Sequence, residues 1–198
     1  MQETISLIVG LGNTGNEYLN TRHNIGFNFV NYLSESYKKD FLVEKRFESE
    51  IIDIFIESKK IFLIKPSNYV NNSGKAVSLV SNYYKIKSKN ILVVHDDLDL
   101  IPGVSKLKFS GGHGGHNGVK DIINHIGKDF WRLKLGIGHP GYGNKNNVTK
   151  HVLGRLKKEE LFAINNSIEN SVSALQKFLT KGSDYAIKDL HDIKKIDT

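Results

Sequence analysis

A short apolar run that ends in a row of glycines is the feature that most constrains how this chain can fold. The run from Ile5 to Val9 predicts a buried strand, and three glycines follow it in the pattern GxGxxG: Gly10, Gly12 and Gly15. In a dinucleotide-binding fold, a helix begins inside this motif and holds the pyrophosphate on its N-terminus. Here the first clear helical pattern starts near Asn24. We therefore interpret the glycines as a tight exit from the strand and keep a nicotinamide enzyme as a minority alternative.

The rest of the chain alternates between β-rich and helical patterns. We expect strands at residues 47–56, 60–64, 90–95, 104–109 and 132–138, and helices at residues 24–38, 70–84, 116–126 and 157–179. Strands that alternate with helices predict an α/β fold. We expect a single domain over residues 1–198, with a mixed, mostly parallel, twisted β-sheet flanked by α-helices. We expect the polar tail after about residue 190 to be frayed.

Charge and composition narrow the classes of function. The chain has no cysteine, which excludes disulfides, thiolate catalysis and Cys-ligated zinc. Its formal net charge of +7 is typical of a protein that binds nucleic acid, and equally of a solvated basic surface. We see no signal peptide and no apolar stretch that approaches the roughly 20 residues needed to span a membrane. The expected location is therefore the cytoplasm.

His23 is the first candidate for chemistry. It lies between Arg22 and Asn24, at a predicted helix start beside a sheet end, where the active sites of α/β folds lie. A lone histidine in such a place is more often structural, so it needs partners. Asp96 closes the apolar strand that begins at Ile91, and a carboxylate there can orient an imidazole and hold its conjugate acid.

Two further segments carry side-chain amides. Asn71 precedes a predicted helix, where its amide can donate to a developing oxyanion or simply cap the helix. The segment 110–118 holds five of the 18 glycines of the chain, which indicates close approach of backbone to another group. Asn117 in that segment offers both a donor and an acceptor.

A metal site is the competing interpretation of the acidic segment. Nitrogen and oxygen ligands are available from His95, Asp96, Asp97 and Asp99, with His113 and His116 as possible additions. A metal-dependent nuclease or phosphoesterase therefore stays open, as does a polar loop without chemistry.

Two predicted strands each present a pair of cations on one face. Strand alternation places Lys106 and Lys108 on one side, and Arg132 and Lys134 share a side of the next strand. Such a face suits a phosphate clamp. A solvated sheet face, or an RNA-binding module without catalysis, is the alternative.

Five motifs in this order resemble the bacterial-type peptidyl-tRNA hydrolase family. They lie at residues 10–26, 71–77, 95–99, 111–118 and 136–141. That family hydrolyses the ester that joins a peptide to the 3′ ribose of tRNA. The resemblance implies a monomeric α/β enzyme that acts on peptidyl-tRNA with no metal, cofactor, membrane or obligate protein partner.

The resemblance also implies roles for individual residues. His23 is implied as the base that activates water, and Asp96 as its orienting carboxylate. The implied substrate-binding residues are Asn13, Tyr18, Val70, Asn71 and Asn117. The implied clamp for the tRNA 5′ phosphate is Lys108 and Lys134, with Lys106 on the same face. Lys134 stands where the family usually has arginine, so it lacks the bidentate phosphate contact of a guanidinium.

Overall fold

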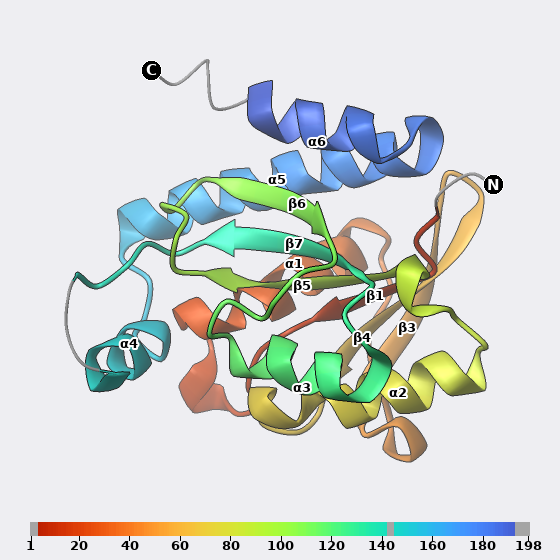
Figure 1. Cartoon of the computed structure of the whole chain (residues 1–198), viewed down its shortest axis with the longest axis horizontal. Helices are drawn as coiled ribbons and strands as arrows, with labels where there is room; N and C mark the ends of the chain where they lie inside the picture. Colours follow the sequence, from red (N-terminus) through yellow and green to blue (C-terminus); the bar gives the residue numbers. More distant parts are fainter. Residues whose placement is uncertain (1–3, 142–144, 193–198) are drawn as a thin grey trace.

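A computed structural model describes residues 4–141 and 145–192 of the chain (Figure 1). Its strands are β1 (Leu7–Gly10), β2 (Leu42–Glu44), β3 (Ser49–Ile56), β4 (Lys59–Pro66), β5 (Ile91–Asp97), β6 (Ser105–Phe109) and β7 (Trp131–Gly136). Its α-helices are α1 (Ile25–Ser36), α2 (Ser73–Tyr83), α3 (Asn117–Ile126), α4 (Lys145–Val152), α5 (Lys158–Lys181) and α6 (Ser183–Asp192).

The described strands form one seven-stranded sheet in the order β2-β3-β4-β1-β5-β7-β6. Strands β4, β1, β5 and β7 are mutually parallel, and the β2–β3, β3–β4 and β6–β7 pairs are antiparallel. Only β3 and β6 therefore run against the other strands. The predicted single α/β domain with a mixed, mostly parallel sheet is confirmed. No helix in the described ranges is long and apolar enough to cross a membrane.

Helices cover both faces of the sheet, because the side chains of each central strand alternate between the faces. In β1, Leu7 and Val9 belong to the core beneath α2 and α3. Ile8 belongs to the larger core that α1, α5 and α6 close from the other side (Figure 1). The parallel strands are buried on both faces, which explains their continuous apolar runs.

The glycines of the first motif serve close packing and a turn. A Cβ atom on Gly10 would lie 2.4 Å from the carbonyl oxygen of Gly26, and one on Gly26 would lie 2.5 Å from the backbone of Leu11. Helix α1 can therefore cross β1 only because both positions lack a side chain. Gly15 has a φ of 117° and turns the chain. Helix α1 starts at Ile25, well past the motif, so the glycines do not place a helix N-terminus for a dinucleotide.

The structure corrects the predicted elements in three places. The predicted helix 70–84 opens with a 3-10 turn, Val70–Asn72, before α2 starts. Strand β2 and the two helices α4 and α6 were not predicted, because their sequences are short or largely polar. Helix α6 extends to Asp192, so the first two residues of the predicted frayed tail are helical. Residues 193–198 of the predicted tail lie outside the described residues.

Candidate active site

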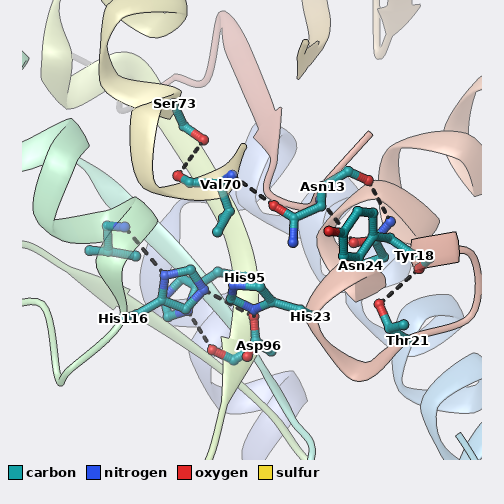
Figure 2. A network of polar contacts seen from close by, with 11 residues as sticks. Asn13, Tyr18, Thr21, His23, Asn24, Val70, Ser73, His95, Asp96 and His116 are labelled. Carbon is teal, nitrogen blue, oxygen red and sulfur yellow. Dashed lines mark hydrogen bonds and ion pairs between the residues drawn. The ribbon is translucent and has the colours of Figure 1, made fainter. Parts of the chain in front are cut away.

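His23 and Asp96 meet at the carboxyl end of the central strands (Figure 2). His23 lies in the 3-10 turn Arg22–Asn24 just before α1, and Asp96 is the second-last residue of β5. The Nδ1 atom of His23 lies 2.8 Å from Oδ1 of Asp96. An ionised carboxylate can only accept a hydrogen bond, so Nδ1 carries the proton and Nε2 keeps a lone pair. This is the arrangement of a histidine that can act as a base.

A second imidazole holds the same carboxylate. His116 Nε2 lies 2.9 Å from Oδ1 of Asp96, and the His116 and His23 rings are 5.0 Å apart between centroids. The backbone N–H of Val119 donates to His116 Nδ1 over 3.3 Å, which caps α3. Both ring nitrogens of His116 are thus engaged, Nε2 with Asp96 and Nδ1 with the N–H of Val119. From the sequence, His116 was proposed only as a metal ligand, and its role as a support of Asp96 was missed.

The carboxylate sets the protonation of the cluster. Burial of Asp96 favours its neutral form, but the charges and hydrogen bonds of His23 and His116 outweigh this and lower the pKa of Asp96 below its usual range. Burial of His23 opposes its protonation, but the charge and the hydrogen bond of Asp96 raise the pKa of His23 above its usual value. Burial and the neighbouring His116 lower the pKa of His95 to about 3, so His95 stays neutral.

Asn13 is held in place by a side chain from the histidine turn. The Asn13 N–H donates to Oδ1 of Asn24, and Nδ2 of Asn24 donates to the Asn13 carbonyl, each over 2.9 Å. Asn24 was predicted as a helix N-cap, but its side chain makes no capping bond and fixes the backbone of Asn13 instead. The N–H of Val70 donates to Oδ1 of Asn13 over 2.8 Å. The oxygen of the Asn13 amide is therefore occupied, and its NH₂ group is the donor that Asn13 offers to a ligand (Figure 2).

The other predicted substrate residues surround this core on separate elements. Val70 is buried, and a Cβ on Gly118 would lie 2.8 Å from its side chain, so the start of α3 lies against it. Asn71 follows Val70 in the same 3-10 turn and Asn117 follows His116 at the start of α3, and both are exposed. The structure thus brings both amides to the rim around the buried cluster.

Tyr18 and Val70 lie on opposite sides of Asn13 (Figure 2). Its ring meets Tyr69 edge-on, with 6.5 Å between centroids. Tyr69 is 61% exposed and directly precedes Val70, so it presents an aromatic surface beside that residue. The sequence pattern did not identify Tyr69 as a candidate. Between the two, the Thr14 hydroxyl donates to the Ser67 carbonyl over 3.3 Å and ties the glycine turn to β4.

The ligand set that the sequence suggested for a metal does not converge. His95 Nδ1 faces the Asp96 carbonyl at 2.7 Å, and the Asp97 carboxylate lies 2.5 Å from Nζ of Lys134. Within residues 4–141 and 145–192, the ligand atoms that do converge belong to His23, Asp96 and His116, and they lie within 4.8 Å of one another. Both imidazoles already donate to one oxygen of Asp96, so this group is stable as a hydrogen-bonded cluster.

The basic face lies on β6 and β7, and β7 is the neighbour in the sheet of the strand β5 that carries Asp96. Lys106 is directly opposite Lys134 across the β6–β7 pair, and Lys108 is opposite Arg132. Arg132, which strand alternation placed on one face with Lys134, is buried, and its guanidinium donates to the carbonyls of Gly111 and Gly112 at 2.6 and 2.5 Å. Arg132 thereby fixes the glycine loop, while Lys106 and Lys108 remain exposed. Lys134 is opposite His95 in the register, so this lysine pair begins one residue from Asp96.

An ion pair anchors the histidine turn to the C-terminal half of the chain. Both terminal nitrogens of the Arg22 fork are used: NH2 contacts the two Glu160 oxygens at 2.9 and 2.7 Å, and NH1 donates to the His151 carbonyl at 3.2 Å. The side chains of Arg22 and Glu160 are only 9% and 21% exposed. The turn that carries His23 is therefore held from α4 and α5 as well as from β1.

We expect Arg22→Ala to lower the free energy of unfolding by about 3 kcal/mol, because it leaves a largely buried carboxylate unpaired. Urea denaturation measures this. In the Arg22→Ala/Glu160→Gln double variant the two losses should not add. Lys39→Ala is the matched control, because the contacts of the Lys39 ammonium with the Asp53 carbonyl at 2.6 Å and with the Asp53 carboxylate at 3.6 Å are exposed. An Arg22→Ala variant as stable as Lys39→Ala would contradict the anchor.

Comparison with known proteins identifies the family of the chain. A sequence model of the family described as Peptidyl-tRNA hydrolase matches residues 7–197. A peptidyl-tRNA hydrolase of Ruthia magnifica is 46% identical over 189 residues, covering 95% of this chain and 98% of the relative. One of Yersinia pseudotuberculosis is 42% identical, covering 96% and 97%. The crystal structure of the peptidyl-tRNA hydrolase from Acinetobacter baumannii superimposes with a TM-score of 0.91 at 41% identity, covering 96% of both chains. With its fold, its motifs and nearly its whole length matched, the chain belongs to the peptidyl-tRNA hydrolase family.

Proposed function

We propose that the chain hydrolyses the ester bond of peptidyl-tRNA, with His23 as the general base. Membership of the family supports the reaction and the substrate. The mechanism rests on one observation, the 2.8 Å contact between His23 Nδ1 and Asp96 Oδ1. This hydrogen bond fixes the tautomer in which Nε2 can accept a proton from water. The first test is hydrolysis of a diacetyl-lysyl-tRNA-type substrate by the wild type and by His23→Ala.

The reaction needs one base, one water and one oxyanion donor. His23 Nε2 takes a proton from water, and the resulting hydroxide adds to the ester carbonyl carbon. The tetrahedral intermediate then expels the ribose 3′ oxygen, which takes the proton back from His23. The products are a peptide with a free carboxyl group and a tRNA with a free 3′ hydroxyl. Asp96 stabilises the imidazolium between the two proton transfers.

Three amides support the substrate in this proposal. The N–H of Val70 holds the oxygen of the Asn13 amide. The NH₂ group of the same amide is therefore preorganised to donate to the developing oxyanion. Asn71 binds the carbonyl region of the peptide from the rim of the site. Asn117 places the water and the substrate beside His116. Tyr18 and Val70 form apolar walls of the peptide site.

We assign the tRNA phosphate to the lysines on β6 and β7. Lys106 and Lys108 are exposed on the edge strand β6, and Lys134 joins them on the same face from β7, the neighbour of β5. The 2.5 Å contact of Lys134 with Asp97 partly neutralises it, so Lys106 and Lys108 carry most of the attraction. In this role the enzyme acts as a cytoplasmic monomer on a single peptidyl-tRNA.

The Lys106→Ala/Lys108→Ala variant should raise KM for peptidyl-tRNA by about tenfold or more at low salt, since two phosphate contacts are lost. The value of kcat should change little, because neither lysine touches the reacting ester. Steady-state kinetics over a range of salt concentrations measures both, and the salt dependence of kcat/KM should become shallower. An unchanged KM and salt slope would remove these lysines from the tRNA site.

The rate should fall on the acid side as His23 gains a proton. Asp96 raises the pKa of His23 above its usual value. As the pH falls, His23 therefore loses its neutral, active form at a higher pH than an ordinary histidine would. We expect log kcat/KM to rise with pH through this pKa and then to level off. The measurement is a pH–rate profile at constant ionic strength. A profile that is flat from roughly pH 5 to 8 would contradict the assignment.

A further inference from the structure

The far end of the sheet carries a second hollow that the reaction above does not use. It has a volume of about 640 Å³ and lies at the amino end of β5, next to the turn Ser88–Asn90. Asn90 and Asp96 are at opposite ends of this strand, which separates the hollow from the active site by about 20 Å. We propose that this hollow binds a nucleotide, with the base against its aromatic side chains and the phosphate on its lysines.

Two pairs of aromatic rings border the hollow from the two faces of the sheet. Phe62 and Tyr84 are stacked with 3.9 Å between centroids, and Phe109 and Trp131 are tilted with 5.1 Å between centroids. Phe109 is 41% exposed, an unusual state for a phenylalanine at the end of a strand. Aromatic side chains that are open on one side stack on bases of any sequence.

Three lysines supply the charge. Lys85, Lys87 and Lys89 alternate along the segment between α2 and β5, and all three line the hollow and are exposed. Across the described parts of the chain, none of the three forms an ion pair. The described lining also contains no acidic side chain. The electrostatic potential in the hollow therefore favours an anion, because no carboxylate in the described lining offsets the charges of the lysines.

The combination of groups selects the class of ligand. Lysines alone would take any anion, and aromatic rings alone would take any flat apolar molecule. A nucleotide satisfies both, because its ring can stack while its phosphate meets the ammonium groups. The hydroxyls of Thr4 and Ser6 and the amide of Asn90 also line the hollow and can bond to the edge of a base or to a ribose. The nucleotide is either free in solution or part of a bound tRNA.

Trp131 makes the test direct, because it is the single tryptophan of the chain and borders the hollow. We expect AMP to bind saturably in calorimetry and to change the Trp131 emission. Adenosine, which lacks the phosphate, and inorganic phosphate, which lacks the base, should each bind more weakly. The Lys85→Ala/Lys87→Ala/Lys89→Ala variant should bind AMP about tenfold more weakly or worse.

Lys106→Ala is the charge control, because Lys106 lies opposite Lys134 on β6 and outside the described lining of the hollow. It should keep wild-type affinity for AMP. No detectable heat of binding up to several millimolar AMP would overturn the proposal. So would equal affinity in the wild type and the triple-lysine variant, since binding would then lie outside the hollow.

Peptidyl-tRNA distinguishes the two sources of the nucleotide. If a tRNA nucleotide occupies the hollow, the triple-lysine variant has a raised KM for peptidyl-tRNA, and tRNA prevents AMP from binding. If the ligand is a free nucleotide, KM is unchanged and AMP binds equally well to the enzyme–tRNA complex. Neither result depends on His23, so a failure here is separate from a failure of the catalytic proposal.

Discussion

Replacing His23 by alanine lowers the rate of peptidyl-tRNA hydrolysis by about 10²–10⁴-fold, the usual contribution of a general base. The expected loss is in kcat, because the remaining site still offers the amide donors and the lysines to the substrate. The His23 side chain is 12% exposed, lies in the turn before α1 and belongs to neither described hydrophobic core, so the variant should remain folded. Steady-state kinetics gives kcat and KM, and circular dichroism with thermal unfolding checks the fold.

The matched control for this variant is His113→Ala. His113 is an exposed histidine in the same glycine-rich loop as His116, and its Nδ1 accepts only from the N–H of Gly115, at 3.1 Å. It should retain wild-type kcat. A variant of His23 that loses affinity for tRNA but keeps kcat would assign this histidine to binding instead of catalysis.

Asp96→Asn should lower kcat by about 10²–10⁴-fold, in the range seen when the orienting carboxylate of a catalytic triad becomes an amide. The NH₂ group of an asparagine can face Nδ1 of His23, which would then have to accept, and the proton would move to Nε2. The base would be lost although every side chain kept its position. His116 should also lose one of its two hydrogen bonds, because its Nε2 donates to the same oxygen.

The same variant has a second, independent readout. Since the charge of Asp96 raises the pKa of His23, its removal should move the acid limb of the remaining activity to lower pH. Asp99→Asn is the control, because Asp99 is exposed and its carboxylate lies outside the cluster. It should change neither the rate nor the pH profile. An acid limb at the wild-type pH in Asp96→Asn would show that another group titrates.

Much of this architecture could be predicted because it depends on local pattern. The apolar runs that became β1 and β5 are continuous because these parallel strands are buried on both faces. Asp96 could be placed at the end of its strand for the same reason. The alternation of Lys106 and Lys108 also follows directly from the strand period and is present in the sheet.

What could not be predicted depends on contacts between distant segments. The ion pair between Arg22 and Glu160 joins residues 138 positions apart, and no local sequence pattern predicts it. Asn24 has the residue type of a helix cap, yet its side chain is used by the backbone of Asn13. The strand period places Arg132 on one face with Lys134, but Arg132 is buried and its guanidinium donates to two carbonyls of the glycine loop. In each case tertiary structure determined which of several possible partners a polar group has.

The central claim is that Nε2 of His23 removes a proton from the attacking water. The most direct test is the single-turnover rate of His23→Ala with saturating enzyme, measured with and without added imidazole. We predict a rate about 10²–10⁴-fold below wild type, partly restored by imidazole in its neutral form, as expected for a missing general base. A near-normal single-turnover rate in His23→Ala without imidazole would contradict the mechanism.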